Sequence, residues 1–149
     1  MNTEVERSKM VVRVERLDGG AVWRVVLNTP RANIIDREKT VALTRVFEDV
    51  CSDANVKAII LEGEGPNFSF GASVQEHLPE SCGEMLSVFH GLFRAMLEAA
   101  VVTLAVVRGN CLGGGLVVAA FCHRIFAAED ARLGQPEIAL GVFAPVASA

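Results

Sequence analysis

Two glycine-marked turns in this chain have the composition needed to hold a developing negative charge through backbone N–H groups. The first is Gly71, followed by Ala72 and Ser73, and the second is the triple glycine of residues 113–115. Each follows a short apolar run typical of a β-strand. Glycine lets the backbone approach a ligand closely, and N–H groups at a helix start carry the positive end of the helix dipole. The pair therefore indicates an oxyanion hole suited to an enolate.

One carboxylate follows the second turn. Glu137 ends a G-Q-P-E segment at residues 134–137. A carboxylate beside an oxyanion hole can accept a proton and return it. A structural interpretation stays open from the residues alone, because Pro136 suits the first turn of a helix and an acidic neighbour there is stabilised by the helix dipole.

The glycines do not match a nucleotide site. Gly109 and Gly114 have the outer spacing of a phosphate loop, but Gly115 and Leu116 stand where that loop requires Lys and Ser or Thr. The glycines of residues 63–65 lack the third glycine that would open a helix in a dinucleotide fingerprint. Close packing of a strand on a helix remains an alternative purpose for the triple glycine.

The elements that must position these residues alternate between strand and helix. Residues 11–16 and 21–27 alternate in polarity around a turn at residues 18–20, which predicts a β-hairpin. The other expected strands are residues 56–61, 103–107 and 125–128; the expected helices begin after Asp36, after Ser73 and near Glu137, and include residues 85–96 and 116–121. This order predicts a single α/β domain without a linker.

Composition excludes several classes of function. The 149 residues are 51% hydrophobic and 21% charged, enough for one buried core. A net charge of -4 leaves no basic field for nucleic acid. Because no apolar run approaches about 18 residues and the N-terminus is polar, we expect a cytoplasmic protein without membrane contact. The four cysteines form no CxxC pair, so we expect buried apolar residues rather than metal ligands or disulfides.

Together these features resemble the crotonase (enoyl-CoA hydratase/isomerase) superfamily. Four motifs stand in that family's order over residues 11–149: an N-x-P-x-x-N-type loop at residues 28–33, G-A-S at 71–73 in place of G-A-D, G-N-C-L-G-G-G at 109–115, and G-Q-P-E at 134–137. The resemblance implies an α/β spiral of β-β-α units. It further implies that residues 1–149 are the N-terminal core of such a domain, poorly active without C-terminal helices, and that the full-length protein is a trimer or a dimer of trimers.

The same resemblance assigns roles to single residues. The backbone N–H groups of Ala72 and Gly114 would hold the thioester oxygen of an acyl-CoA, and Glu137 would be the acid–base group. No cofactor or metal is implied, because the coenzyme A thioester is itself the substrate. The residues expected to contact the acyl-CoA are Arg31, Ala32, Ala72, Ser73, Val74, His77, Gly113, Gly114 and Val117.

The acid–base residues limit which reaction of the superfamily we expect. Hydratases of the superfamily carry two glutamates, and Val117 stands where the first would be. Residues 65–79 and 141–145 are similar to the cyclohexa-1,5-diene-1-carbonyl-CoA hydratases of anaerobic aromatic degradation, so we expect water addition to a cyclic conjugated dienoyl-CoA. Two alternatives stay open: a one-carboxylate isomerase or decarboxylase acting on another acyl-CoA, and a non-catalytic CoA-binding remnant.

Histidine and phenylalanine side chains are expected to be mainly structural. His77 follows the first glycine turn and is either a second proton carrier or a solvated residue at a helix end. His90 and His123 are expected to be structural. The phenylalanines near the turns are expected in the core rather than against a substrate: Phe68, Phe70 and Phe89.

Overall fold

A computed structural model describes residues 11–29, 31–73 and 82–141 of the chain. It is built from interspersed strands and helices, the α/β composition that the sequence predicts. The strands are β1 (Val12–Leu17), β2 (Val22–Leu27), β3 (Ala58–Gly63), β4 (Val102–Val107), β5 (Asn110–Leu112), β6 (Arg124–Ala127) and β7 (Arg132–Gly134). The helices are α2 (Arg37–Cys51), α3 (Cys82–Ala99) and α4 (Gly113–Ala120), with short 3-10 segments η1 (Asp18–Gly20) and η3 (Pro136–Leu140).

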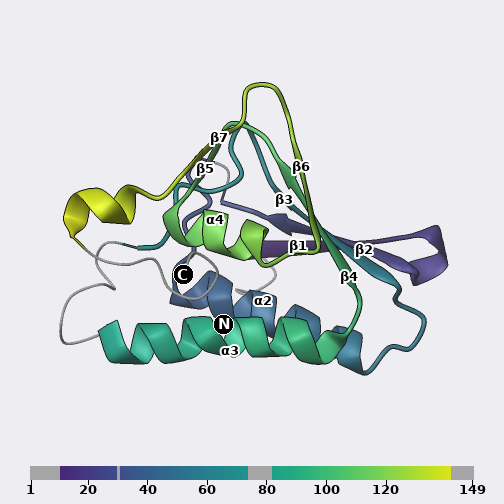
Figure 1. Cartoon of the computed structure of the whole chain (residues 1–149). Helices are drawn as coiled ribbons and strands as arrows, with labels where there is room; N and C mark the ends of the chain where they lie inside the picture. Colours follow the sequence, from purple (N-terminus) through teal and green to yellow (C-terminus); the bar gives the residue numbers. More distant parts are fainter. Residues whose placement is uncertain (1–10, 30, 74–81, 142–149) are drawn as a thin grey trace, which may run out of the picture.

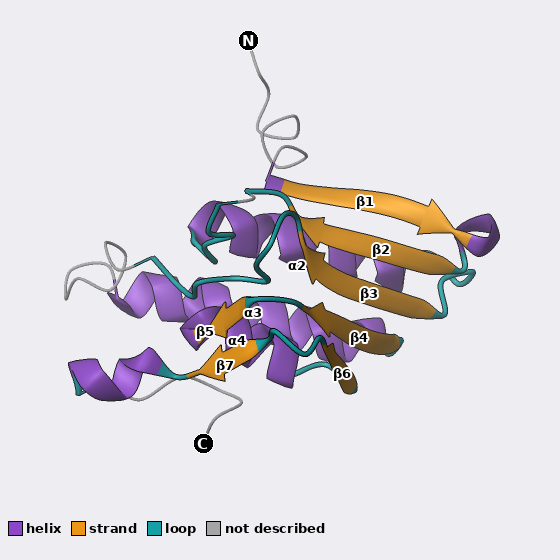
Figure 2. Ribbon diagram, turned by 90° about the horizontal axis from the view of Figure 1, so that it is seen from above, coloured by secondary structure: helices purple, strands orange, loops and turns teal. Residues whose placement is uncertain are grey.

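The main sheet has five strands in the order β1-β2-β3-β4-β6. The predicted hairpin is confirmed, since β1 and β2 are antiparallel with Val12 opposite Leu27. The strands β3, β4 and β6 are added in parallel, and the sheet is seen from above in Figure 2. Because parallel strands end at the same edge of a sheet, the segments that follow β3 and β4 are brought together there.

The helices α2 and α3 lie side by side along one face of this sheet (Figure 1). Asp36 caps α2 as predicted, since its side chain accepts from the backbone N–H of Lys39. Phe121, which follows α4, contacts Phe93 of α3 with ring centroids 4.8 Å apart. The core between sheet and helices includes Trp23, Val25, Leu27, Leu43, Phe47, Ile59, Leu61, Leu92, Ala105, Val107, Val117 and Val118.

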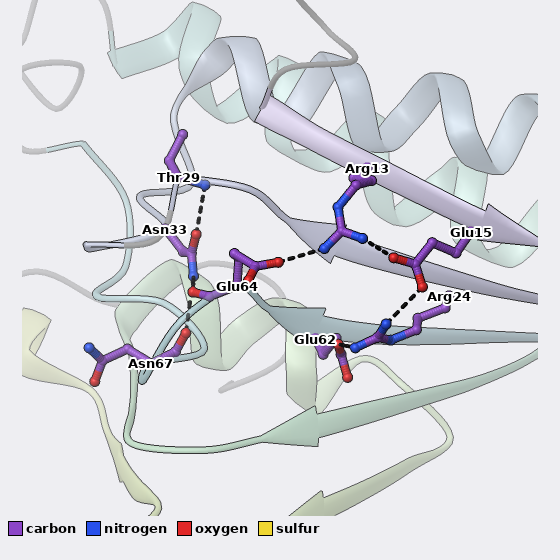
Figure 3. A network of polar contacts seen from close by, with 8 residues as sticks. All are labelled: Arg13, Glu15, Arg24, Thr29, Asn33, Glu62, Glu64 and Asn67. Carbon is purple, nitrogen blue, oxygen red and sulfur yellow. Dashed lines mark hydrogen bonds and ion pairs between the residues drawn. The ribbon is translucent and has the colours of Figure 1, made fainter.

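The opposite face of β1, β2 and β3 carries a chain of ion pairs, drawn in Figure 3. Arg13 pairs with Glu15 and Glu64, and Arg24 pairs with Glu15 and Glu62. Exposure of the side chains is between 32% and 42% for four of these residues: Arg13, Glu15, Arg24 and Glu64. Exposed pairs of this kind contribute little to stability, so the network mainly marks the solvated face of the sheet.

Several element predictions differ from the structure. Residues 109–114, whose glycines indicate a loop in the sequence, contain the strand β5, which pairs in parallel with β7, a strand not predicted at all. Strands this short have too few residues to show an alternating pattern. Helix α4 begins at Gly113 rather than at residue 116, and the helix expected near Glu137 is a 3-10 segment that starts at Pro136.

Burial also corrects some expectations. Phe68 and Phe89 are buried as predicted, whereas Phe70 is 41% exposed. Cys111 and Cys122 are buried, but Cys51 is exposed and Cys82 is half-buried, so only part of the cysteine prediction holds. The helix expected after Ser73 falls on residues 74–81, outside the described part of the chain. Among the described helices, none combines the length and apolar character that crossing a bilayer requires.

Candidate active site

The two glycine-marked turns meet in the folded chain. A Cβ placed on Gly114 would stand 3.2 Å from the Cβ of Ala72 and 3.3 Å from its backbone nitrogen. Gly114 lies in the first turn of α4, where N–H groups have no acceptor within the helix, and Leu112 at the cap position makes no side-chain hydrogen bond. Two backbone segments far apart in sequence therefore present their N–H groups within one small region.

Ser69 fixes the distance between these turns. Its fully buried hydroxyl accepts a hydrogen bond from the backbone N–H of Gly71 at 3.1 Å, and its carbonyl accepts one from Leu112 at 2.9 Å. A Cβ on Gly115 would stand 2.5 Å from the hydroxyl oxygen of Ser69. Gly71 itself has φ of +103°, a conformation that favours glycine. The third glycine of the triple thus serves close packing, as the structural alternative proposed.

A second polar contact connects the same segments further from the turns. The Oδ1 atom of Asn67 accepts from the backbone N–H of Asn110 at 2.9 Å and from its side-chain amide at 2.8 Å. A Cβ on Gly109 would come within 2.2 Å of the carbonyl oxygen of Pro66. The segment after β3 therefore lies directly on the segment after β4, and the two turns are held in register.

Glu137 places its carboxylate beside this junction. A Cβ on Gly113 would stand only 2.4 Å from the Oε1 atom of Glu137. The Oε2 atom is buried and has no hydrogen-bond partner among the described residues. A buried carboxylate oxygen without a donor is unfavourable in a purely structural role. The arrangement leaves an acceptor available to a water molecule or a substrate proton.

Ala72, Gly114 and Glu137 line one pocket. Its other lining residues come from the start of α2 and from α3: Ile35, Asp36, Arg37, Thr40, Met85, Val88 and Phe89. The α3 residues are apolar, whereas the α2 side is polar. A ligand here would meet backbone N–H donors, the unpartnered carboxylate oxygen of Glu137 and an apolar wall, the combination needed to bind and polarise an apolar thioester.

The loop that precedes α2 is attached to the first turn. The backbone N–H of Phe70 donates to the carbonyl of Ala32 at 2.9 Å, and that of Ile35 donates to the carbonyl of Gly71 at 2.8 Å. Arg31 is exposed and Ala32 is half-buried. Neither lines the pocket, so their predicted contact with the CoA part remains a prediction.

Asn33 closes this loop on itself and on β3 (Figure 3). Its side-chain oxygen accepts from the backbone N–H of Thr29 at 2.9 Å, and its amide donates to the carbonyls of Glu64 and Asn67 at 3.0 Å each. Asn33 is fully buried with φ of +45°, a region that Asn tolerates better than most residues. The loop is therefore fixed at both ends.

Lys39 lies buried beneath the loop. Its ammonium donates to the hydroxyl of Thr29. Burial lowers its pKa to about 8, against the opposing influence of the carboxylates of Asp36 and Glu38. A lysine that is only 1% exposed is costly to keep charged, so the loop contact is sensitive to its protonation.

The structure groups some predicted site residues and separates others. Gly113 contacts Glu137 beside the pocket, and Ser73 follows the pocket residue Ala72 along the chain. Val117 is fully buried within α4 and does not line the pocket. Val74 and His77 lie outside the described residues.

Asp36 is one of the pocket residues that sequence analysis did not place at the site. The sequence predicts it only as a helix cap, and nothing in the local pattern indicates that the start of α2 faces Ala72. Phe89, expected to be a core residue, is both buried and part of the pocket wall. Within the described residues, no group of three or more His, Cys, Asp or Glu side chains could hold a metal ion.

Contacts of His123 support the structural role expected for it, whereas the role of His90 stays a prediction. His90 is exposed on α3. The Nδ1 atom of His123 accepts from the backbone N–H of Thr103 at 3.1 Å and contacts its hydroxyl at 2.9 Å. His123 therefore joins the segment after α4 to β4, and it is not among the pocket residues.

Comparisons with known proteins identify relatives of this chain. The model of the Enoyl-CoA hydratase/isomerase family matches residues 18–148. The chain is 48% identical to cyclohexa-1,5-dienecarbonyl-CoA hydratase of Thauera aromatica, over 95% of this chain and 54% of that protein. Among solved structures, DspI of Pseudomonas aeruginosa has a TM-score of 0.83 and 29% identity over 90% of this chain and 52% of its own.

An enoyl-CoA hydratase from Thermoplasma volcanium is also similar in structure, with a TM-score of 0.80 and 27% identity over 91% of this chain and 55% of its own. The crotonase-type α/β fold expected from the sequence is confirmed by these structural matches. The chain spans about half the length of the relatives that it matches.

Proposed function

Because this chain belongs to the enoyl-CoA hydratase/isomerase family, we propose that the protein adds water to a cyclic conjugated dienoyl-CoA. Cyclohexa-1,5-diene-1-carbonyl-CoA is the proposed substrate, since the relative from Thauera aromatica is named for that activity and is 48% identical. The proposal concerns the whole protein, as a homo-oligomer, and places it in anaerobic degradation of aromatic compounds.

One observation carries the proposal: the carboxylate of Glu137 borders the pocket in which Ala72 and Gly114 lie together. In the proposed reaction, the N–H groups of Ala72 and Gly114 donate to the thioester oxygen. Charge builds up on that oxygen as the enolate forms, and each donor contributes about 3 kcal/mol to the transition state. Hydration of a conjugated thioester needs this stabilisation.

Glu137 accepts and then donates the proton in the proposed reaction. It accepts a proton from water while the oxygen of that water bonds to the ring carbon, and the electrons of the double bond move to the thioester oxygen. The protonated Glu137 then donates its proton to a carbon of the enolate, which restores the thioester carbonyl. Atoms balance with one water consumed, and the carboxylate is regenerated.

The apolar wall of the pocket supports a hydrocarbon acyl group. Met85, Val88 and Phe89 come from α3, and Ile35 faces the pocket from the loop before α2. These side chains offer no polar partner to the acyl group, so they favour a hydrocarbon over a hydroxylated or charged one.

Mass spectrometry of full-length protein incubated with candidate acyl-CoAs tests the proposal. Hydration adds the mass of one water, isomerisation leaves the mass unchanged, and decarboxylation removes carbon dioxide. We expect one added water with the cyclic dienoyl-CoA, and its loss in Glu137→Gln by about 10²-fold or more while acyl-CoA binding persists. An unchanged substrate mass in the wild type, or full turnover in the variant, contradicts the proposal.

A further inference from the structure

Asp36 lies in the same pocket as Glu137, Ala72 and Gly114. A single carboxylate must otherwise both deprotonate the water and hold it in position. Val117 occupies the place of a second glutamate, and its side chain is fully buried in α4. The position expected to carry a second glutamate is therefore apolar. The second carboxylate at the pocket is that of Asp36, at the start of α2.

The cap of α2 uses only part of the hydrogen-bonding capacity of the Asp36 carboxylate. Its Oδ1 atom accepts from the backbone N–H of Lys39 at 2.8 Å. A carboxylate has two oxygens and about four acceptor positions, so one cap bond leaves most of its capacity. Asp36 is half-buried at the pocket wall, which gives water access to it.

The backbone fixes Asp36 relative to the oxyanion turn. Ile35, the preceding residue, forms a parallel bridge with Ala72. On the other side, the carbonyl of Asp36 accepts from the backbone N–H of Thr40 at 2.9 Å and from its hydroxyl at 2.7 Å. Asp36 therefore directly follows Ile35, whose backbone is paired with Ala72 in the first glycine-marked turn.

The Asp36 carboxylate lies beside a positive charge and at the start of a helix. The buried ammonium of Lys39 attracts its carboxylate, and the side chain lies at the N-terminal end of α2, where the helix dipole favours negative charge. Arg37, also at the pocket, pairs with Glu84 of α3. A carboxylate in this position can accept hydrogen bonds from water.

We propose that Asp36 is the second water-binding carboxylate of the site, capping α2 with one oxygen and orienting the attacking water with the other. This inference rests on the proposed hydratase function. The water donates one hydrogen bond to Asp36 and loses its other proton to Glu137 as its oxygen bonds to carbon. Asp36 contributes orientation, and Glu137 carries the proton.

Two substitutions separate this role from capping. Asp36→Asn and Asp36→Ser both keep a side-chain oxygen that caps a helix well, but each removes the second carboxylate oxygen. We expect kcat for hydration to fall about 10- to 100-fold in both, with KM and Tm close to wild type. Glu48→Gln, an exposed acid-to-amide change later on α2, is the matched control and should keep full kcat.

Exchange in D₂O of the product hydrogen that Glu137 delivers to carbon adds a readout that a structural role would not move. This exchange requires Glu137 and the oxyanion turns but not the attacking water, so it should persist in Asp36→Asn and disappear in Glu137→Gln. Full kcat in both Asp36 variants, or a loss of kcat and exchange together with a fall in Tm, overturns the inference. If Glu137→Gln also keeps full turnover, the proposed function fails as well, so the two failures are distinguishable.

Discussion

The carboxylate of Glu137 lies against the backbone of Gly113, where a side chain would collide with it. A Cβ on Gly113 would stand 2.4 Å from Oε1 and 3.2 Å from Cδ of Glu137, and Gly113 has φ of +48°. Each of the three glycines in this segment is therefore required by a different neighbouring group. Gly113 makes room for the carboxylate, Gly114 makes room for Ala72, and Gly115 makes room for Ser69.

Gly113→Ala should displace the carboxylate and slow the reaction. The added methyl group overlaps Oε1, and the positive φ disfavours any side chain. We expect kcat to fall by about 10²-fold or more, measured by steady-state kinetics with the cyclic dienoyl-CoA. Gly91→Ala in α3 is the control, because nothing lies within 4 Å of its Cβ position. Wild-type kcat in Gly113→Ala would show that Glu137 acts from elsewhere.

Gly115→Ala should lower the stability of the fold, because the added methyl group overlaps Ser69; we expect no direct effect on the reaction. Its Cβ would stand 2.5 Å from both Cβ and Oγ of Ser69, and overpacking of this kind costs about 1–3 kcal/mol. The double variant with Ser69→Gly should lose less stability than the two single changes added together. Urea unfolding of the four proteins measures this coupling, and strict additivity would contradict the contact.

Val117→Glu should destabilise the protein instead of restoring a second catalytic glutamate. Val117 is fully buried among core residues, so a carboxylate there would be desolvated and its pKa raised. We expect Tm to fall by several degrees, with no gain in crotonyl-CoA hydration. Ala120→Glu, on an exposed position of the same helix, is the control for helix propensity and charge. A stable variant with faster crotonyl-CoA turnover would show that Val117 faces the substrate.

Lys39 should make the stability of the protein depend on pH. Its folded-state pKa of about 8 lies below the ordinary value of 10.5, so the unfolded chain binds more protons between these values. The contribution of Lys39 to the free energy of unfolding therefore rises with pH across this window and is lowest below about pH 8. The full change is about 3 kcal/mol.

Urea unfolding of wild type and Lys39→Met at several pH values checks this expectation. The free energy of unfolding of the variant, relative to wild type, should fall as pH rises from about 8 to 10.5, because only the wild type gains from losing the buried charge. Lys57→Met is the control, since Lys57 is exposed and donates to the carbonyl of Ala54. A difference that stays constant with pH for Lys39→Met would contradict the lowered pKa.

Local chemistry determined much of this protein from the sequence alone. The hairpin follows from alternating polarity around residues 18–20, and the start of α2 follows from Asp36 at its cap. The motifs around Ala72, Gly114 and Glu137 indicated an oxyanion hole with one carboxylate. Each of these signals lies within a few residues of chain, where backbone sterics and neighbouring side chains decide the conformation.

Tertiary structure alone decided which of these segments meet. The contact between Ala72 and Gly114 depends on the parallel addition of β4 to β3, and the pairing of β5 with β7 brings Glu137 to Gly113. The place of Asp36 in the pocket and the exposure of Phe70 depend on packing between distant segments. Long-range contacts of this kind leave no periodic pattern in the sequence, because each is set by how whole elements pack and not by the residues beside it.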